Sequence, residues 1–206
     1  MTLQRRDRAF LFTSVMIQAI EQVDHPKTQT RRVVSAAGTP IAQVGDLGWI
    51  RETWATLAQY DSLPPSQIPL HDRPPSLVYG AWTGAARDIE WRGRWRSGRF
   101  MPKWAARIWI EVLGVRQEYL HDISEADCLA ETGAVPVWPG PGPEPYRRNI
   151  RGVFASLWDV INGQRAPWDS NPLVWVVTFR RLSQEETDVH RFRAFADAKR
   201  RLARAA

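Results

Sequence analysis

The stretches that decide the fold are residues 106–115, which read ARIWIEVLGV, and residues 173–181, which read LVWVVTFRR. In the first stretch, isoleucine or valine fills every second position from 108 to 112, and this period of two predicts a strand. The second stretch is apolar on both of its faces, which favours a strand inside a sheet. Together they predict a sheet at the centre of the fold.

Shorter elements surround these two strands. Apolar runs predict further strands at 9–13, from Val33 onward and at 47–53, and a hairpin of 77–82 with 88–91. Helical spacing predicts helices at 14–22 with Ser14 as cap, at 124–131 between Ser124 and Gly133, at 153–161 and from 184 onward. The strands do not alternate with helices as in a βαβ array, so we expect an α+β fold around a curved or closed sheet.

Two proline-rich stretches interrupt this pattern, at about 55–76 and at about 134–148. Neither is suited to a core helix or strand, so we interpret both as insertions in a single domain of residues 1–183. Residues 184–206 follow as a C-terminal basic amphipathic helix, with an apolar stripe of Val189, Phe192, Phe195 and Leu202.

The composition narrows the range of partners. The net charge of +6 favours an anionic partner such as nucleic acid. The 11 tryptophans exceed what one core needs, so we expect several on a half-exposed, ligand-facing surface. Cys128 is the only cysteine and is expected in the core, and the histidines are scattered, so we expect no metal and no cofactor. The apolar stretch at 9–20, which follows three arginines, is interrupted by polar residues and has no cleavage site after it, so we expect no signal peptide. No stretch reaches the length of a membrane span, and we expect a cytoplasmic protein.

Two basic segments carry the candidate chemistry. The first is Lys27-Thr28-Gln29-Thr30-Arg31-Arg32, whose cations and hydroxyls form a compact anion site or, alternatively, a solvated turn. The second reads WRGRWRSGRFMPKW at 91–104 and interleaves cations with aromatic rings, as surfaces that bind single-stranded nucleic acid do. Its alternative is a loop whose tryptophans pack on the core. Its candidate ligand-binding residues are Arg94, Trp95, Lys103 and Trp104.

A series of short motifs runs through residues 9–182. After the first basic segment come Gly45-Asp46, then WIRETW at 49–54, MPKWA at 101–105, DISE at 122–125, a helix over 154–162 and Asn171-Pro172. This order resembles the ASCH-domain family, and most of all its phage- and prophage-encoded members. The resemblance implies a PUA-like β-barrel flanked by helices, with a cleft beside the first helix.

The resemblance also implies a role with RNA or a modified nucleoside. One short bacterial branch of the family hydrolyses N4-acetylcytidine with a lysine, a threonine three residues later and a glutamate in a later helix. These residues match Lys27, Thr30 and, if residues 120–131 align without a gap, Glu131. The present chain is much longer than members of that branch. The expected ligand-binding residues of the cleft are Arg31, Arg32, Trp49, Arg51, Glu52 and Trp54.

The chemistry of this trio can be stated in physical terms. A threonine hydroxyl is a weak nucleophile and needs a base. A lysine can serve as that base if neighbouring cations and a dry cleft lower its pKa. Our first hypothesis is a protein that binds RNA or a nucleoside in a basic cleft. The second is an amidohydrolase for N4-acylated cytidine, and a weaker third is a ribonuclease. A structural role in phage assembly has no physical support, and the oligomeric state stays open.

Overall fold

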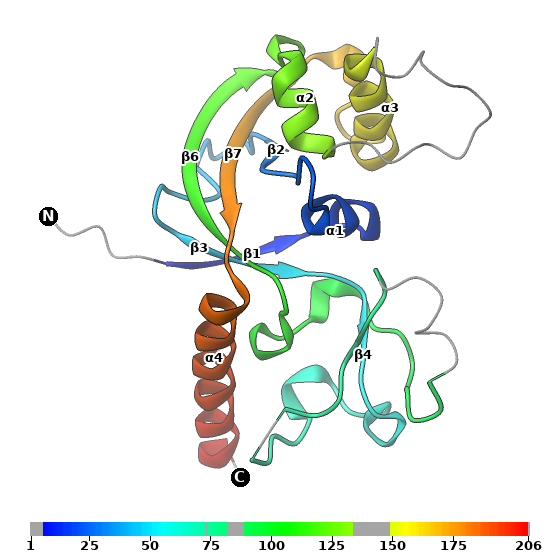
Figure 1. Cartoon of the computed structure of the whole chain (residues 1–206), viewed down its shortest axis with the longest axis vertical. Helices are drawn as coiled ribbons and strands as arrows, with labels where there is room; N and C mark the ends of the chain where they lie inside the picture. The colour runs from blue at the N-terminus through cyan, green and yellow to red at the C-terminus, as the bar shows by residue number, and fades with distance from the viewer. Residues whose placement is uncertain (1–5, 73, 82–88, 134–148, 206) are drawn as a thin grey trace, which may run out of the picture. The chain divides into compact units, whose positions relative to one another are not determined.

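The computed structural model describes residues 6–72, 74–81, 89–133 and 149–205 (Figure 1). By its internal contacts the chain divides into two compact units. The first unit contains residues 1–18, 47–111 and 181–206, and the second contains residues 19–46 and 112–180. The expectation of a mixed α+β fold is confirmed, because helices and a mixed sheet are both present.

The main sheet has five strands in the order β1-β3-β6-β7-β2. Their bounds are β1 Asp7–Leu11, β2 Gln29–Val33, β3 Leu47–Arg51, β6 Trp109–Tyr119 and β7 Leu173–Arg181. β1 pairs with β3 in parallel, whereas β3 with β6 and β2 with β7 are antiparallel. In the described residues β1 and β2 end the order and do not pair with each other, so this sheet is open rather than a closed barrel.

The first unit is built on β1, β3 and the beginning of β6. Gly48 in β3 permits a close approach, since a Cβ there would lie 2.5 Å from Ile110 and 2.9 Å from Phe10. A core of tryptophans and aliphatic residues, including Trp54, Trp104 and Trp109, fills this unit. The long helix α4 (Gln184–Ala205) covers part of that core and contacts the turn at Lys103–Ala105.

The C-terminal helix has the predicted bounds, but its buried face differs from the predicted stripe. Ala194 and Phe195 are buried, while Val189 and Phe192 are 45% and 72% exposed. The buried face is built partly from alanines, whose small side chains let the helix approach the core. A stripe defined by large apolar residues alone therefore lies beside the face that the helix buries.

The second unit contains β2, β7 and the remainder of β6. Two helices, α2 (Glu125–Thr132) and α3 (Ile150–Asn162), pack against each other, and α2 also contacts β2. Ser124 caps α2 as predicted, by accepting a hydrogen bond from the amide of Asp127, and Gly133 ends it with a φ of 72°. Cys128 is fully buried in this core, as expected.

Several local predictions need correction. The helix α1 (Ser14–Glu21) is capped by the hydroxyl of Thr13, which accepts from the amide of Met16 at 3.4 Å, and not by Ser14. β2 begins at Gln29 rather than Val33, because pairing with β7 extends over its whole length. The strand β5 (Val78–Tyr79) pairs with β4 (Trp54–Ala55) rather than with residues 89–91, while residues 82 and 88 of the predicted hairpin lie outside the described residues.

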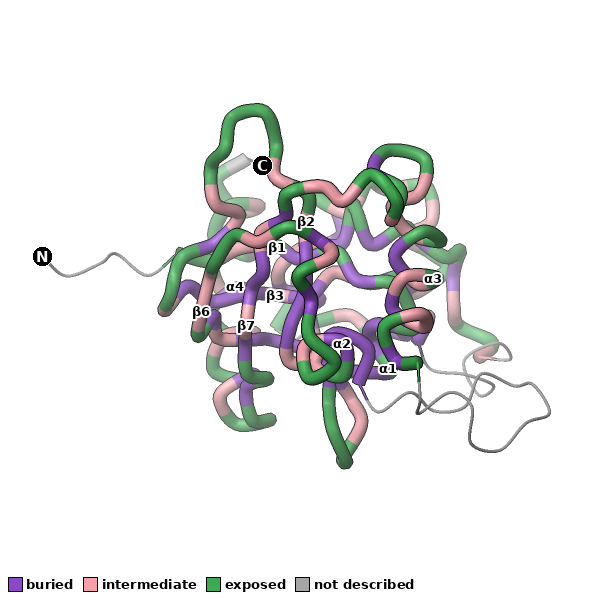
Figure 2. Tube along the Cα trace, turned by 90° about the horizontal axis from the view of Figure 1, so that it is seen from above, coloured by how far each residue is buried: buried purple, intermediate pink, exposed green. Residues whose placement is uncertain are grey.

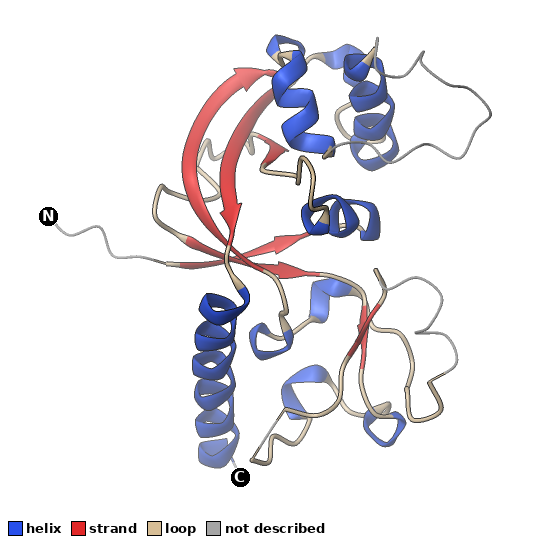
Figure 3. Cartoon of the chain, viewed as in Figure 1, coloured by secondary structure: helices blue, strands red, loops and turns tan. Residues whose placement is uncertain are grey.

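The two proline-rich stretches differ in what can be said of them. Residues 55–76 contain two single turns of 3-10 helix, at Ala58–Tyr60 and Pro65–Gln67, and they bury Ile68 and Leu70 (Figure 3). Residues 134–148 lie outside the described residues. Buried residues concentrate in β2, β3, β7 and the beginning of β6, whereas Phe10 is the buried residue of β1 (Figure 2). None of the helices in the described part of the chain has the length and apolar character of a membrane span.

Candidate functional site

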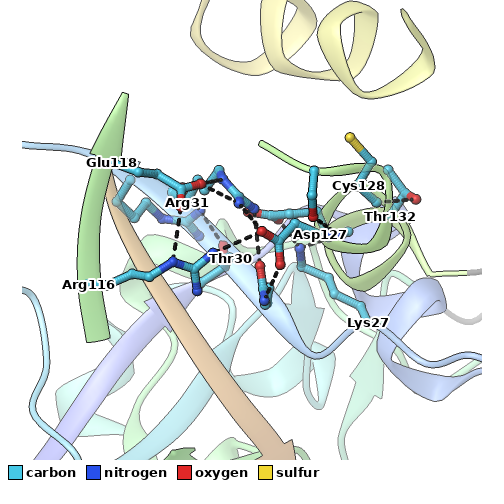
Figure 4. Close-up of polar contacts among 12 residues, drawn as sticks. Lys27, Thr30, Arg31, Arg116, Glu118, Asp127, Cys128 and Thr132 are labelled. Atoms are coloured by element: carbon cyan, nitrogen blue, oxygen red, sulfur yellow. Dashed lines mark hydrogen bonds and ion pairs between the residues drawn. The ribbon is translucent and has the colours of Figure 1, made fainter. Parts of the chain in front are cut away.

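The first basic segment lies in the second unit, within a dense group of charged side chains. Lys27 precedes β2, Gln29 to Arg32 lie on β2, and the other members come from β6 and α2. Figure 4 shows their side chains converging from these elements. We call this group the charged cluster; it comprises Lys27, Gln29, Thr30, Arg31, Arg32, Arg116, Glu118, Asp127 and Glu131.

Lys27 is held against Glu131 inside the protein. Its Nζ lies 2.5 Å from Glu131 Oε2 and also donates to the Glu131 carbonyl at 2.5 Å. The side chains are 0% and 4% exposed. The backbone fixes the segment as well, since the amide of Lys27 bonds the carbonyl of Ala19 and the amide of Thr28 bonds that of Ala130. The sequence paired Lys27 with Glu131 only on an ungapped alignment, and the structure brings the two together.

Arg31 braces the carboxylates of the cluster. Its guanidinium donates to Glu118 at 2.5 Å and 3.0 Å, and it lies 3.3 Å from Asp127 and 3.4 Å from Glu131. Gln29 accepts a further bond from Arg31 and donates one to Asp127. Both oxygens of Glu131 are therefore held, one by Lys27 and the other by Arg31.

Thr30 is fully buried and takes a different partner from Lys27. Its hydroxyl accepts a hydrogen bond of 2.6 Å from Arg32, which also donates to the carbonyl of Arg31. Side chains alternate between the two faces of a strand, so Thr30 shares its face with Arg32, and Arg31 shares the other face with Gln29. An arginine that donates to the threonine oxygen favours the ionised form of the hydroxyl.

Burial and charge act in opposite directions on the ionisable groups. Burial lowers the pKa of Lys27; Glu131 opposes this shift, and the nearby charges of Arg32 and Arg31 add to it. For Asp127, burial acts to raise the pKa, but the Gln29 hydrogen bond and the charges of Arg31 and Arg116 outweigh it and hold the pKa below its usual range. A buried lysine with a lowered pKa beside a carboxylate is a common feature of functional sites.

The other residues predicted for the cleft, at positions 49–54, lie in the first unit. Glu52 and Trp54 point into its core, where Glu52 bonds Arg107 at 2.8 Å and 3.1 Å and Trp54 is fully buried. Trp49 and Arg51 are partly exposed, with the Arg51 guanidinium 5.7 Å from the Trp49 ring centre, and Trp49 packs against the same core as Trp54. The four residues therefore do not form one exposed surface.

The second basic segment also lies in the first unit, and its four candidates have separate environments. Arg94 and Trp95 are exposed. Lys103 forms an ion pair with Asp7. Trp104 is 4% exposed and meets Trp54 edge to face, so it belongs to the core rather than to a stacking surface. Only the first two are placed to meet a ligand from solvent.

Two acidic members of the cluster, Glu118 and Asp127, were not predicted from the sequence. Two signals could have found them. Asp127 and Glu131 are four residues apart on α2 and so share one face of that helix. Arg116 and Glu118 stand two apart on β6 and share one face of that strand. In the described residues no group of three or more histidine, cysteine or carboxylate side chains is arranged to hold a metal ion.

The comparisons with known proteins give one structural likeness. No family model and no curated protein matches the chain. Among solved structures, the chain is similar to a high-resolution crystal structure of an ASCH domain from Lactobacillus crispatus JV V101. The TM-score is 0.38 and the sequence identity 10%, over 85% of this chain and 79% of that one. Any assignment of function therefore rests on the chemistry of this chain's own residues.

Proposed function

We propose that this chain is an ASCH-type protein that binds a nucleoside-type ligand at the charged cluster and hydrolyses its amide bond, with N4-acylated cytidine as the substrate class. The observation that carries the proposal is the 2.5 Å contact of Lys27 with Glu131, both buried, beside Arg31 and Arg32. A lysine in this setting has a lowered pKa, which makes it a more available base than a lysine in water.

The proposed reaction assigns one role to each residue of the trio. Lys27 takes the proton of the Thr30 hydroxyl, whose oxygen attacks the acyl carbonyl. The C–N bond then breaks, and the cytidine N4 leaves as an amine with the proton that Lys27 returns. Water hydrolyses the resulting Thr30 ester, which frees the acid and restores the hydroxyl. Glu131 orients Lys27 through the contact described above.

The charge balance of the cluster favours a small ligand over a long phosphate backbone. Arg31 is already paired with Glu118, Asp127 and Glu131, and Arg116 with Glu118 and Asp127. A surface that binds many phosphates needs cations available to them. Here the carboxylates neutralise most of the positive charge that the sequence places in residues 27–32.

The test is hydrolysis of N4-acetylcytidine by the purified chain, followed by chromatography of the cytidine released. Lys27→Met and Thr30→Val are each expected to lower turnover by at least about 100-fold, the range that a base or a nucleophile contributes. Glu131→Gln is expected to lower it less if its role is orientation. Matched controls at exposed positions are Lys199→Met, Thr39→Val and Glu125→Gln. Turnover like that of the wild type in Lys27→Met or Thr30→Val would reject the mechanism.

A second candidate is ligand binding without chemistry. It is favoured by one observation, that the Thr30 hydroxyl bonds Arg32 rather than Lys27 in the structure. In that case, titration calorimetry would detect binding of cytidine or N4-acetylcytidine that Lys27→Met weakens, while no acylated cytidine is turned over.

A further inference from the structure

The exposed part of the second basic segment is unlike the charged cluster. Residues 91–99, which we call the Arg/Trp segment, carry Trp91 and Trp95 at 40% and 38% exposure. Arg94 and Arg99 are exposed as well. Two large rings and two guanidinium groups thus face solvent within nine residues. Exposed apolar groups that gather in this way often mark a binding surface.

The backbone of the Arg/Trp segment is anchored at several points. Residues 54 and 96 exchange both backbone hydrogen bonds, at 2.8 Å and 3.1 Å, and the amide of Gly93 bonds the carbonyl of Thr56. Both carboxylate oxygens of Asp61 accept from the amide of Arg94 at 2.9 Å. Gly93 is required for this contact, because a Cβ there would lie 2.3 Å from Asp61 Oδ1.

The inward side chains of the segment complete this anchoring. Arg96 is buried and its guanidinium donates to the carbonyls of Tyr60 and Leu63, at 2.6 Å and 2.9 Å. With Gly93 and Arg96 directed inward, the backbone presents Arg94 and Trp95 outward in a fixed position. A ligand that meets them does not first have to order a loose loop, which lowers the entropic cost of binding.

The outward groups have the chemistry of a stacking platform. The Arg92 guanidinium lies 4.8 Å from the centre of the Trp95 ring, so the ring is supported on one side by a planar cation. Within the described residues, the guanidinium groups of Arg94 and Arg99 have no hydrogen bond or ion pair to another residue. Asp61, the carboxylate that meets this backbone, is engaged by the Arg94 amide.

From these observations we infer that the Arg/Trp segment binds single-stranded nucleic acid, with a base stacked on Trp95 and phosphates at Arg94 and Arg99. A flat exposed ring accepts any base, because every base has a π-face, and unpaired guanidinium groups attract the backbone. Trp91 offers a second exposed ring four residues away. This binding does not depend on the chemistry proposed for Lys27.

The experiment is fluorescence anisotropy of the full chain with a labelled single-stranded uridine oligonucleotide, repeated over a series of salt concentrations. Trp95→Ala is expected to weaken binding about tenfold, as the loss of one base stack does. Arg94→Met is expected to weaken it about threefold and to reduce the slope of log K against log salt by about 1. A DNA oligonucleotide of matched sequence reports whether the sugar contributes.

Matched controls distinguish binding by this surface from nonspecific binding by exposed rings or cations elsewhere on the chain. Phe192→Ala removes another exposed ring and Arg165→Met another exposed cation, and both are expected to bind like the wild type. Anisotropy reports binding without turnover, so failure of the amidase proposal is distinguished from failure of this one. Wild-type affinity in Trp95→Ala, or equal competition by a polyglutamate peptide, would overturn the inference.

Discussion

Residues 27–32 and residues 91–99 look alike in the sequence, yet the fold gives them opposite environments. In the first segment Lys27 and Arg31 are buried and meet the carboxylates of Glu118, Asp127 and Glu131. In the second, Arg94 and Arg99 face solvent. The acids that neutralise the first segment lie about 90 to 100 residues further along the chain. The charge of a short window is therefore a poor guide to the field around it, because partners distant in sequence decide that field.

The difference between the two segments is tested most directly with one arginine from each, Arg31 and Arg94. Arg31→Met removes a buried guanidinium that serves three carboxylates, so we expect a loss of about 5 kcal/mol in the free energy of unfolding. Arg94→Met at the exposed position is expected to change it by no more than about 0.5 kcal/mol. Urea denaturation of both variants measures the contrast. Equal small effects would mean that the charged cluster is not stabilising the second unit.

The two tryptophans that were both expected to bind ligand provide a second contrast. Trp104 packs in the core of the first unit, so Trp104→Ala is expected to cost about 3–4 kcal/mol. Trp95→Ala is expected to cost less than about 1 kcal/mol, because the ring is already partly in water. Thermal and urea unfolding report both values. A stable Trp104→Ala variant would contradict the assignment of this ring to the core.

The sequence predicted the regular elements well where one periodicity dominated. β7 and α4 begin at the expected residues, and α2 has the expected cap and stop. Local rules decide such features: the alternation of a strand, the serine before a helix and the glycine after it. The predicted start of β2 at Val33 was wrong because local rules do not cover this strand. Gln29 to Arg32 are polar and gain their strand conformation by pairing with β7.

The candidate site was predicted in part. Lys27, Thr30, Arg31 and Arg32 share one short segment, and Glu131, which the family resemblance also named, lies at hydrogen-bonding distance from Lys27. Its bracing by Arg31 was not foreseeable, because it depends on how α2 and β6 meet β2 in three dimensions. Nor could the sequence show that Glu52 and Trp54 are buried while Trp49 and Arg51 are partly exposed, since a strand pattern does not say which positions are buried.

Cys128 offers a probe of the cluster that needs no mutation. It lies one turn from Glu131 on α2, and burial raises its pKa to about 11 from 9.0. At mildly alkaline pH this shift alone lowers the thiolate fraction about 100-fold, and burial adds to the protection. We expect iodoacetamide to label the native chain at least about 100-fold more slowly than the unfolded chain.

The same labelling reaction also tests whether the two basic segments differ in their contribution to the packing of α2. Arg31→Met is expected to speed the labelling of Cys128, because α2 loses a contact that holds it to β2. Arg94→Met is expected to leave the rate unchanged. Cys128 is the only cysteine, so mass spectrometry of the intact chain gives the rate directly. Fast labelling of the native wild-type chain would show that α2 opens readily.

The smallest expected effect is the dependence of stability on pH through Lys27. Because the pKa of Lys27 is lowered in the folded chain, the unfolded chain binds a proton that the folded chain lacks between that lowered pKa and the ordinary value of 10.5. Stability therefore rises with pH in this window, by at most about 1.4 kcal/mol per pH unit for one group, and falls as pH decreases through it. Lys27→Met lacks this contribution, while Cys128, whose raised pKa acts in the opposite direction above 9.0, is common to both chains and cancels. Urea unfolding at several alkaline pH values should give a steeper rise for the wild type than for the variant. Equal slopes would mean that Glu131 compensates the burial of Lys27 in full, and Lys27 would then be a structural cation rather than a base.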